Sequence, residues 1–359
     1  MEILPPYAVT PSGTQCLFEP LNQFSSGGIT NAYACGLSEA HASYCARYDH
    51  LEAKICFLCF DNDHLDLDQR MISKALQKYD LKPDDYFSCT WETAQIECEE
   101  IDGKLLVDKN EVSVVFFHTT YSPDHFIMNK DWIMKMVIEK SRAVKVPSVL
   151  GQLAGTKKIQ QAMTERPALR HFVKQSQKGR DCDVDDIVDQ LLSFSLKQVD
   201  TADATGDSLA MIHDALEAPQ NYVLKPQREG GGNNFFGEEL KDRLKHKLRN
   251  EHKITSCDTL VEKIKSQPLY TTAGLLEKDG TIFGESTNPR VVSEFGVFTS
   301  YFTQGSDCRD GFTEGVRNNA SNHVGGVFCR TKLAKDNEGG VCAGHGFLDT
   351  PWFAALSGK

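Results

Sequence analysis

The strongest chemical signal in the chain is the segment 222–234, which reads YVLKPQREGGGNN. A predicted strand ends at Lys225, and three consecutive glycines follow before a predicted helix. Glycines have no Cβ, so backbone N–H groups can approach phosphate oxygens closely. Lys225 would add positive charge, and the Glu229 carboxylate could share a magnesium ion with the phosphates. Asn233 and Asn234 add amide groups. Because GxxxxGK[ST] is absent, the pattern indicates a phosphate loop that is not of the Walker A kind.

A second group of cations lies in QLAGTKKIQQAM, residues 152–163. Thr156 can cap a helix that begins with Lys157 and Lys158. Cations at a helix start oppose the helix dipole, so this placement favours a role for at least one lysine in binding a nucleotide phosphate. Two solvated surface lysines are the alternative reading of this segment.

A third group lies in CRTKLAKDNEGGVCAG, residues 329–344. On a strand, Arg330 and Lys332 point to the same face, where two cations would suit an anionic substrate group and a phosphate. The glycines that follow are typical of a mobile loop that closes over a reactive intermediate. A plain hairpin turn is the alternative.

Alternating strand and helix patterns must position these residues. Apolar runs at 54–60 and 112–117 predict strands, and helical periodicity covers 66–80 and 130–142. This alternation indicates an α/β layer with a largely parallel sheet. Pro147 is a candidate boundary at the end of that layer.

The second half of the chain has a different pattern. Strands are predicted at 222–226 and 259–264, with a helix at 237–248 between them. The polar stretch 175–210 is expected to be a surface connection with one short helical piece. Residues 270–349 are expected to alternate short strands with glycine-rich turns.

Composition excludes several classes of protein. The 359 residues are 40% hydrophobic and 25% charged, as in a soluble globular protein, and no apolar run is long enough to span a bilayer. The net charge of -11 argues against nucleic acid or an anionic membrane as the main partner. Cys56 and Cys59 lie in an apolar strand pattern and are expected to be buried small side chains, not a redox pair. A cytoplasmic location is expected. Secretion stays open if a signal peptide was removed.

Six motifs, KPQREGGGNN, QLAGTKK, VEKI, SEFG, CRTK and GGVCAG, together resemble eukaryotic glutathione synthetase, an ATP-grasp ligase. The resemblance is strongest over 142–163, 222–239 and 322–351, and the N-terminal part of the family has no counterpart here. It implies an α/β protein with the ATP-grasp ligase fold. Residues 1–147 would form an α/β substrate-side domain, and residues 148–359 the ATP-grasp domain with its phosphate loop and lid loop.

The resemblance also implies roles for individual residues, with Glu262 and Ile264 on the adenine side. The positions that correspond to ATP contacts in the family are Lys157, Lys225, Gly230, Gly231, Gly232, Asn233, Asn234, Phe236, Val261, Glu262, Lys263, Ile264, Glu294, Lys332 and Glu338. Those that correspond to substrate contacts are Ser25, Asp63, Gln69, His118, Tyr121, Arg330, Val341 and Cys342. The magnesium ligands would be Glu19, Asn22 and Glu229, and the catalytic cations Arg330, Lys225 and Lys332.

Departures from the family pattern gather on the substrate side. His118 stands in place of an arginine, and an imidazole cannot form the two-pronged bond of a guanidinium with a carboxylate. Leu65 replaces an asparagine and Asp63 a glutamate. On the nucleotide side, Phe236 replaces a tyrosine and Glu338 an aspartate. The expected substrate pocket is therefore altered, while the ATP half is nearly complete.

The resemblance implies an ATP- and Mg2+-dependent ligase that joins γ-glutamylcysteine and glycine through an acyl phosphate. The alternatives are a diverged paralogue without this activity, acting as a nucleotide-binding or secreted interaction protein, and a ligase for a different thiol peptide. The expected partners are small-molecule substrates, with neither nucleic acid nor membrane, and a homodimer stays open.

Overall fold

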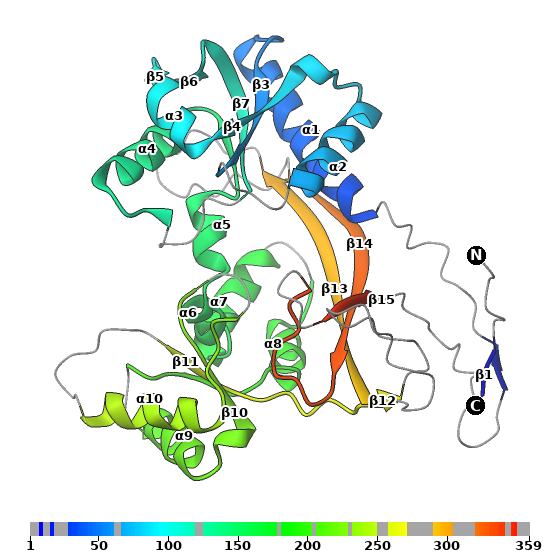
Figure 1. Ribbon diagram of the computed structural model, residues 1–359, viewed down its shortest axis with the longest axis vertical. Coiled ribbons are helices and arrows are strands. Elements are labelled where there is room, and N and C mark those ends of the chain that lie inside the picture. Colours follow the sequence, from blue (N-terminus) through cyan, green and yellow to red (C-terminus); the bar gives the residue numbers. More distant parts are fainter. Residues whose placement is uncertain are drawn as a thin grey trace, which may run out of the picture.

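The computed structural model of the chain describes residues 7–9, 15–17, 28–60, 66–118, 125–177, 181–202, 206–228, 232–249, 258–270, 290–303, 320–341 and 346–349. An α/β layer stands at one end and two antiparallel sheets stand at the other, and two long strands run between them (Figure 1). The chain is thus a mixed α/β protein, as expected.

The first layer is built on a six-stranded sheet of order β4-β3-β7-β6-β5, with β8 beside β7. Its strands are β3 (Lys54–Cys59), β4 (Tyr86–Thr90), β5 (Cys98–Ile101), β6 (Lys104–Val107), β7 (Asn110–Phe117) and β8 (Val144–Val146). The pairs β3–β4, β3–β7 and β7–β8 are parallel, as the sequence predicts, whereas β5, β6 and β7 form an antiparallel meander.

Helices cover both faces of this sheet, which explains why its central strands are apolar throughout. Ile55 and Phe57 pack on one face with α1 (Gly28–Tyr48) and α2 (Asp66–Leu76). Cys56 and Leu58 pack on the other face with α3 (Trp91–Glu97) and α4 (Asn129–Lys140). Cys56 and Cys59 are both buried, as expected. Eight cysteines in the described part of the chain are free thiols.

The second part contains a three-stranded antiparallel sheet of order β10-β11-β9. Its strands are β9 (Gln198–Asp200), β10 (Tyr222–Lys225) and β11 (Thr259–Glu262). Leu224 and Leu260 pack against α9 (Gly206–Glu217) and α10 (Gly237–Arg249). The interpretation of 175–210 as a surface connection was wrong, because β9 is a strand of this sheet. Three residues are too few to show a strand period.

A four-stranded antiparallel sheet lies opposite, with order β12-β13-β14-β15. Its strands are β12 (Leu269–Tyr270), β13 (Arg290–Thr303), β14 (Ala320–Leu333) and β15 (Phe347–Asp349). The expectation of short strands was wrong, because β13 and β14 each extend over 14 residues. Their glycines lie inside the strands, and not in turns. A Cβ on Gly296, for example, would lie 1.7 Å from Phe328.

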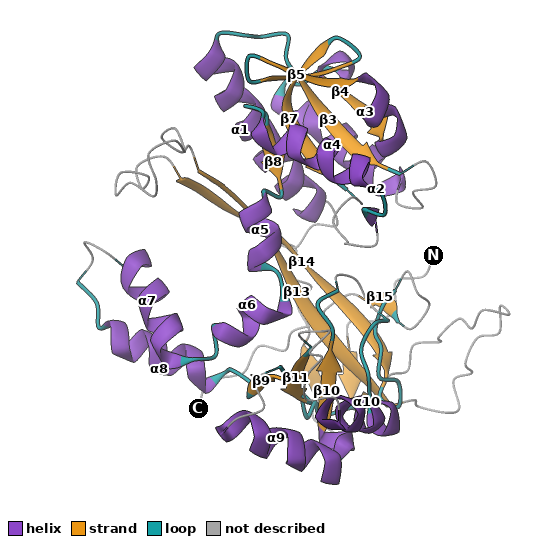
Figure 2. Cartoon of the chain, turned by 90° about the vertical axis from the view of Figure 1, so that its left-hand side faces the viewer, coloured by secondary structure: helices purple, strands orange, loops and turns teal. Residues whose placement is uncertain are grey.

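The hairpin of β13 and β14 reaches from the second part to the first layer (Figures 1 and 2). Its far end packs on α1, where a Cβ on Gly325 would lie 1.7 Å from the Cβ of Ala32. Tyr33 lies beside Phe298, with 5.9 Å between ring centroids, and Phe302 packs against the core of the first layer. One hairpin therefore belongs to both parts of the molecule.

A run of four helices makes the covalent connection between the parts (Figure 2). It follows a cis Val146–Pro147 peptide bond and comprises α5 (Val149–Ala154), α6 (Lys157–Ala162), α7 (Arg166–Ser176) and α8 (Val184–Ser193). The short strands β1 (Tyr7–Val9) and β2 (Gln15–Leu17) form a separate antiparallel ribbon. Among the helices that the structure describes, none has the length and apolar character needed to cross a membrane.

Candidate functional site

The predicted phosphate loop leaves the edge of one sheet and returns to it. β10 ends at Lys225, and Leu224 and Phe235 exchange backbone hydrogen bonds of 3.1 and 2.9 Å. The residues between them are thus held as a loop closed at its base. Gly232 has a φ of +84°, a conformation that favours glycine. The guanidinium of Arg243 lies 4.2 Å from the Phe235 ring centroid and supports the returning strand.

Lysine and glutamate side chains converge beside this loop. Burial lowers the pKa of Lys225, and so does the charge of Lys157, while Glu338 and Glu294 oppose the shift. Burial also lowers the pKa of Lys332, and Glu338 and Glu294 again oppose it. Lys332 Nζ also donates to Asn337, next to the Glu338 that accepts from Asn234, and the same two carboxylates act on both lysines, so Lys225 on β10 and Lys332 on β14 border one space beside the loop. An anion entering that space would stabilise the protonated form of both lysines.

The segment that follows β14 is tied to the loop and to β11. The Asn234 side chain donates to Glu338 Oε1 at 3.1 Å. Lys263 Nζ donates to the side chain of Asn337 at 2.9 Å, and Lys332 Nζ donates to the Asn337 backbone oxygen at 2.8 Å. Lys263 also lies 5.7 Å from the ring centroid of Phe236. Five predicted nucleotide residues therefore meet around one turn.

The edge predicted to hold adenine is shaped by β11 and its continuation. Val261 is buried and lies opposite Val223, on the sheet face away from the helices. Glu262 accepts a hydrogen bond from the Lys197 backbone at 3.3 Å, so its carboxylate stays near the strand. Ile264 is 69% exposed, which leaves an apolar side chain at the rim of the space between the sheets.

Arg330 and Glu294 form a two-pronged ion pair across β13 and β14. They are direct partners in the register of the two strands. Arg330 donates from Nε at 2.9 Å and from one terminal nitrogen at 2.8 and 2.7 Å. The guanidinium predicted to bind the substrate carboxylate is thus already held in the orientation that a carboxylate requires.

On the substrate side, Gln69 and His118 come together. Gln69 Nε2 donates to His118 Nδ1 at 3.2 Å, and Gln69 Oε1 accepts a hydrogen bond from Ser88 at 3.1 Å. His118 follows the carboxyl end of β7, and its backbone N–H donates to the Leu58 oxygen on β3. Two residues 49 positions apart therefore share one polar contact where parallel strands end, which is the usual binding edge of such sheets.

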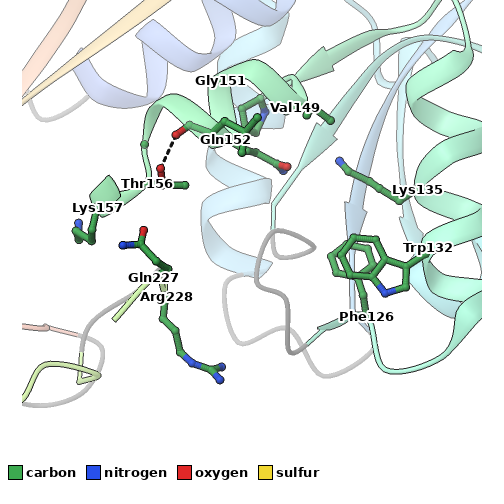
Figure 3. Close-up of a pocket in the computed structure, with 13 residues that line it drawn as sticks. Phe126, Trp132, Lys135, Val149, Gly151, Gln152, Thr156, Lys157, Gln227 and Arg228 are labelled. Carbon is green, nitrogen blue, oxygen red and sulfur yellow. Dashed lines mark hydrogen bonds between the residues drawn. The ribbon is translucent and has the colours of Figure 1, made fainter. Parts of the chain in front are cut away.

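A cavity of about 490 Å3 lies between the first layer and the phosphate loop (Figure 3). Phe126, Trp132 and Lys135 line one side, and Lys157, Gln227 and Arg228 line the other, with α5 between them. The ring centroids of Phe126 and Trp132 lie 4.7 Å apart. Burial lowers the pKa of Lys135, although its ion pair with Glu139 at 2.9 Å opposes that shift. The cavity thus combines an aromatic wall with cationic side chains.

The two lysines at the start of α6 differ in their contacts. Thr156 caps this helix as predicted, with its hydroxyl accepting from the Ile159 backbone. Lys158 Nζ bonds to Asp200 on β9 at 2.5 Å, and its backbone N–H donates to Gln227. Lys158 therefore ties α6 to the sheet, and Lys157 is the lysine that lines the cavity and acts on Lys225.

Several predicted site residues lie outside the described residues, namely Glu19, Asn22, Ser25, Asp63, Leu65, Tyr121, Glu229, Gly230, Gly231 and Cys342. Val341 lies directly before the last of these. The sequence did not single out Gln227 and Arg228, although they precede Glu229 in the loop motif. It also missed the aromatic wall, because Phe126 and Trp132 belong to no recognisable motif and meet only in the folded chain.

Comparison with known proteins shows the family to which the chain belongs. The family model described as eukaryotic glutathione synthase, ATP binding domain, matches residues 14–353. Glutathione synthetase of Xenopus laevis is 31% identical over 329 residues, which are 91% of this chain and 63% of that protein. The human glutathione synthetase is 33% identical over 70% of this chain and 47% of its own length. The chain thus spans between two fifths and two thirds of the curated relatives that it matches.

A similar solved structure is a glutathione synthetase-like effector from Globodera pallida in its apo form. The two structures align with a TM-score of 0.60 and 19% sequence identity. The alignment covers 90% of this chain and 61% of the effector chain. At that identity the likeness speaks for the fold alone. It agrees with the arrangement of sheets and helices described above.

Proposed function

Because this chain belongs to the eukaryotic glutathione synthetase family, we propose that it is an ATP- and magnesium-dependent ligase that joins a carboxylate to an amine. The observation that carries the proposal is the meeting of Lys157, Lys225 and Lys332 beside the closed glycine loop. In this proposal residues 1–147 form the substrate-side domain and residues 148–359 the ATP-grasp domain, with the hairpin of the second resting on the first.

The proposed reaction has two steps. A carboxylate oxygen of the acid substrate attacks the γ-phosphorus of ATP, and ADP leaves with the electrons of the broken bond. The amine then attacks the carbonyl carbon of the acyl phosphate, inorganic phosphate leaves, and the amine loses a proton. γ-Glutamylcysteine and glycine are the substrates that the family implies for these steps.

The residues present fit a nucleotide. Lys225 and Lys332 approach from the two facing sheets, and Lys157 adds a third cation from α6. Phosphates placed there would meet positive charge in a partly desolvated space, where charge stabilisation is strong. Val261, Glu262 and Ile264 would bound the base at the edge of the same space. Glu338 would hold Asn234 at the mouth of the loop.

Magnesium would be held by Glu229, Glu19 and Asn22, which lie outside the described residues. Glu294 and Glu338, the two carboxylates that act on both Lys225 and Lys332, are engaged already, since Glu294 pairs with Arg330 and Glu338 accepts from Asn234. Oxygen ligands of the three predicted residues suit a hard cation of this kind. When bound, the ion would neutralise the charge of the transferred phosphoryl group.

We propose that the acid substrate binds between Arg330, Gln69 and His118. Arg330 would supply the fork for a carboxylate, and Gln69 would supply an amide to the polar part of the dipeptide. His118 replaces the arginine of the family, so this end of the pocket would hold its substrate through one or two hydrogen bonds, without the fixed charge of a guanidinium. Weaker binding of γ-glutamylcysteine, or preference for a related thiol peptide, is the expected consequence.

The test is phosphate release from ATP and Mg2+ with γ-glutamylcysteine, in the presence and absence of glycine. Ligase activity predicts release that requires both substrates and yields one glutathione per phosphate. Lys225→Ala should abolish it. Lys174→Ala should leave it unchanged, because this lysine is exposed on α7, away from the loop.

Two results would argue against the proposal. Release that does not depend on the dipeptide would indicate a simple ATPase. ATP binding by calorimetry without any release would indicate a nucleotide-binding protein that does not turn over these substrates. A panel of other γ-glutamyl thiol peptides then separates a changed substrate from a lost activity.

A further inference from the structure

A group of metal-ligating side chains lies where the hairpin meets α1, and none of these residues has a role in the proposed reaction. Cys35 and Glu39 are four residues apart on α1 and share one helix face. His323 lies on β14. One ligand atom of each residue lies within 4.8 Å of the other two.

Two of the three side chains already interact. His323 Nε2 lies 2.7 Å from Glu39 Oε1, and Ser321 donates to Glu39 Oε2 at 2.5 Å. The carboxylate is therefore oriented by Ser321 through one oxygen while its other oxygen faces the imidazole. A hydrogen-bonded carboxylate held in this way is the usual support of a metal ligand. Cys35 is a free thiol, partly buried, on the same side of the helix.

A second observation points to a missing ligand. Ser300 is the direct strand partner of His323, so their side chains lie on the same face of the hairpin. Its hydroxyl oxygen is buried and finds no hydrogen-bond partner among the described residues. It faces α1, since a Cβ on Gly36 would lie 3.2 Å from it. A buried hydroxyl in this position lacks a partner that a metal-bound water would provide.

We propose that Cys35, Glu39 and His323 bind a Zn2+ ion, with water in the fourth position. A thiolate together with an imidazole selects zinc over magnesium or calcium. Zinc bonds of about 2.0–2.3 Å at tetrahedral angles separate ligand atoms by roughly 3.3–3.8 Å. Glu39 and His323, now 2.7 Å apart, therefore move slightly apart, and the 4.8 Å limit on all three ligand atoms leaves only small side-chain adjustments to make.

Zinc binding changes a defined set of protons and bonds. The Cys35 thiol loses its proton to solvent and its sulfur bonds to the ion. The proton on His323 Nε2 moves to Nδ1 by exchange with solvent, Nε2 and a Glu39 oxygen then exchange their mutual hydrogen bond for bonds to zinc, and Ser321 keeps its bond to the carboxylate. Because the ligands come from α1 and β14, the ion would fasten the hairpin to the first layer. Its expected role is therefore to stabilise the contact between the two parts.

The experiment titrates Zn2+ alone into chelator-treated full-length protein, without ATP or magnesium, in competition with a chromophoric chelator. One ion per chain is expected. Cys35→Ser and His323→Gln should each lower the affinity at least tenfold. Cys182→Ser should leave it unchanged, because Cys182 is exposed beside α8, far along the chain from either ligand-bearing element. Circular dichroism confirms that each variant is folded.

Cobalt substitution identifies the ligands directly. Co2+ should give a thiolate charge-transfer band in the near ultraviolet that Cys35→Ser removes and Cys182→Ser retains. Zinc that binds equally well to the Cys35→Ser and His323→Gln variants would overturn the proposal. So would a stoichiometry well below one ion per chain in the folded wild type. Neither result bears on the ligase activity, which is measured separately.

Discussion

Arg330 forms a two-pronged ion pair with Glu294, and the geometry of this pair indicates which kind of group Arg330 can bind. Glu294 holds the guanidinium through three donor–acceptor contacts of 2.7 to 2.9 Å. A substrate carboxylate would compete with Glu294 for the same fork. A lysine would keep the charge but not the geometry, because its ammonium is a point charge.

Arg330→Lys is therefore expected to raise KM for the dipeptide about tenfold or more, the loss of roughly 1.5–3 kcal/mol for a charged hydrogen bond. ATP affinity should change less than about twofold, since Lys157, Lys225 and Lys332 remain. Steady-state kinetics and calorimetry measure the two effects. Arg290→Lys, an exposed position on the same hairpin, is the matched control. An equal loss in both variants would argue against a role for the fork.

The lowered pKa values of Lys225 and Lys332 predict how nucleotide binding depends on pH. Burial destabilises their protonated forms in the free protein, and phosphates would restore them. Binding should therefore take up protons, and ATP affinity should fall as pH rises toward ~10.4, the ordinary lysine value. Calorimetry in buffers of different ionisation enthalpy counts the protons. Lys225→Arg should flatten the dependence, and a profile unchanged by this variant would contradict the assignment.

At the scale of elements, α1 and the hairpin approach so closely that only glycine fits between them. A Cβ on Gly325 would lie 1.7 Å from the Cβ of Ala32, and a Cβ on Gly28 would lie 2.5 Å from the Gly325 oxygen. Strand and helix thus meet backbone to backbone. Any side chain at Gly325 has to push them apart.

Gly325→Ala should accordingly lower the free energy of unfolding by roughly 1–3 kcal/mol, the usual cost of overpacking. Gly155→Ala is the matched control. There an added Cβ meets its nearest atom at 3.5 Å, an ordinary contact, and the backbone is helical. Denaturant titrations of both variants provide the comparison. Equal stability of Gly325→Ala and wild type would mean that the hairpin can shift on α1 at little cost.

The elements that the sequence predicted well have either a continuous apolar run or a regular helical period. β3, β7 and β10 stood out because their apolar runs are continuous, and α10 because its period is regular. The long strands β13 and β14 were missed because glycines such as Gly296 and Gly325 resemble turns in a one-dimensional reading. They mark close approaches to Phe328 and to α1, which are visible only once the partner is known.

In the candidate site, too, some features could be predicted from local motifs and others depend on the fold. Lys157, Lys225 and Lys332 were predicted from local motifs, and the structure brings them to one space. The ion pair of Arg330 with Glu294 was not, because it depends on the strand register that sets residues 36 positions apart side by side. The contact of Gln69 with His118 likewise required the order of the parallel strands. Neither contact can be predicted from the spacing of these residues along the chain.

At the scale of the whole molecule, a buried carboxylate in the first layer makes the free energy of unfolding depend on pH. Glu111 is 6% exposed and bonds to Lys104 at 2.9 Å and to the Tyr44 hydroxyl at 2.8 Å. Burial alone would raise its pKa, but these bonds, with the nearby His50, hold the pKa below its usual value. The carboxylate therefore stabilises the fold above its unfolded pKa of ~4.3. That stability is lost as pH falls through the lower folded value.

Glu111→Gln should cost roughly 1–3 kcal/mol of unfolding free energy at neutral pH. The difference between variant and wild type should shrink as the solution is acidified below pH ~4. Urea titrations at a series of pH values measure it. Glu99→Gln, an exposed carboxylate on β5, is the control and should show little effect at any pH. A constant difference across the series would show that the Glu111 charge is not the cause.

The contact between the hairpin and α1 joins segments that are synthesised at different times. α1 leaves the ribosome early, but the strands that cover its small-residue face are among the last described parts of the chain to be made. At typical rates of synthesis the interval is roughly a quarter of a minute to a minute. Throughout that interval the nascent first layer presents an incomplete surface. The contact between α1 and the hairpin can therefore form only after the hairpin has been synthesised, and chaperones that bind exposed apolar surface would act on the first layer during that interval.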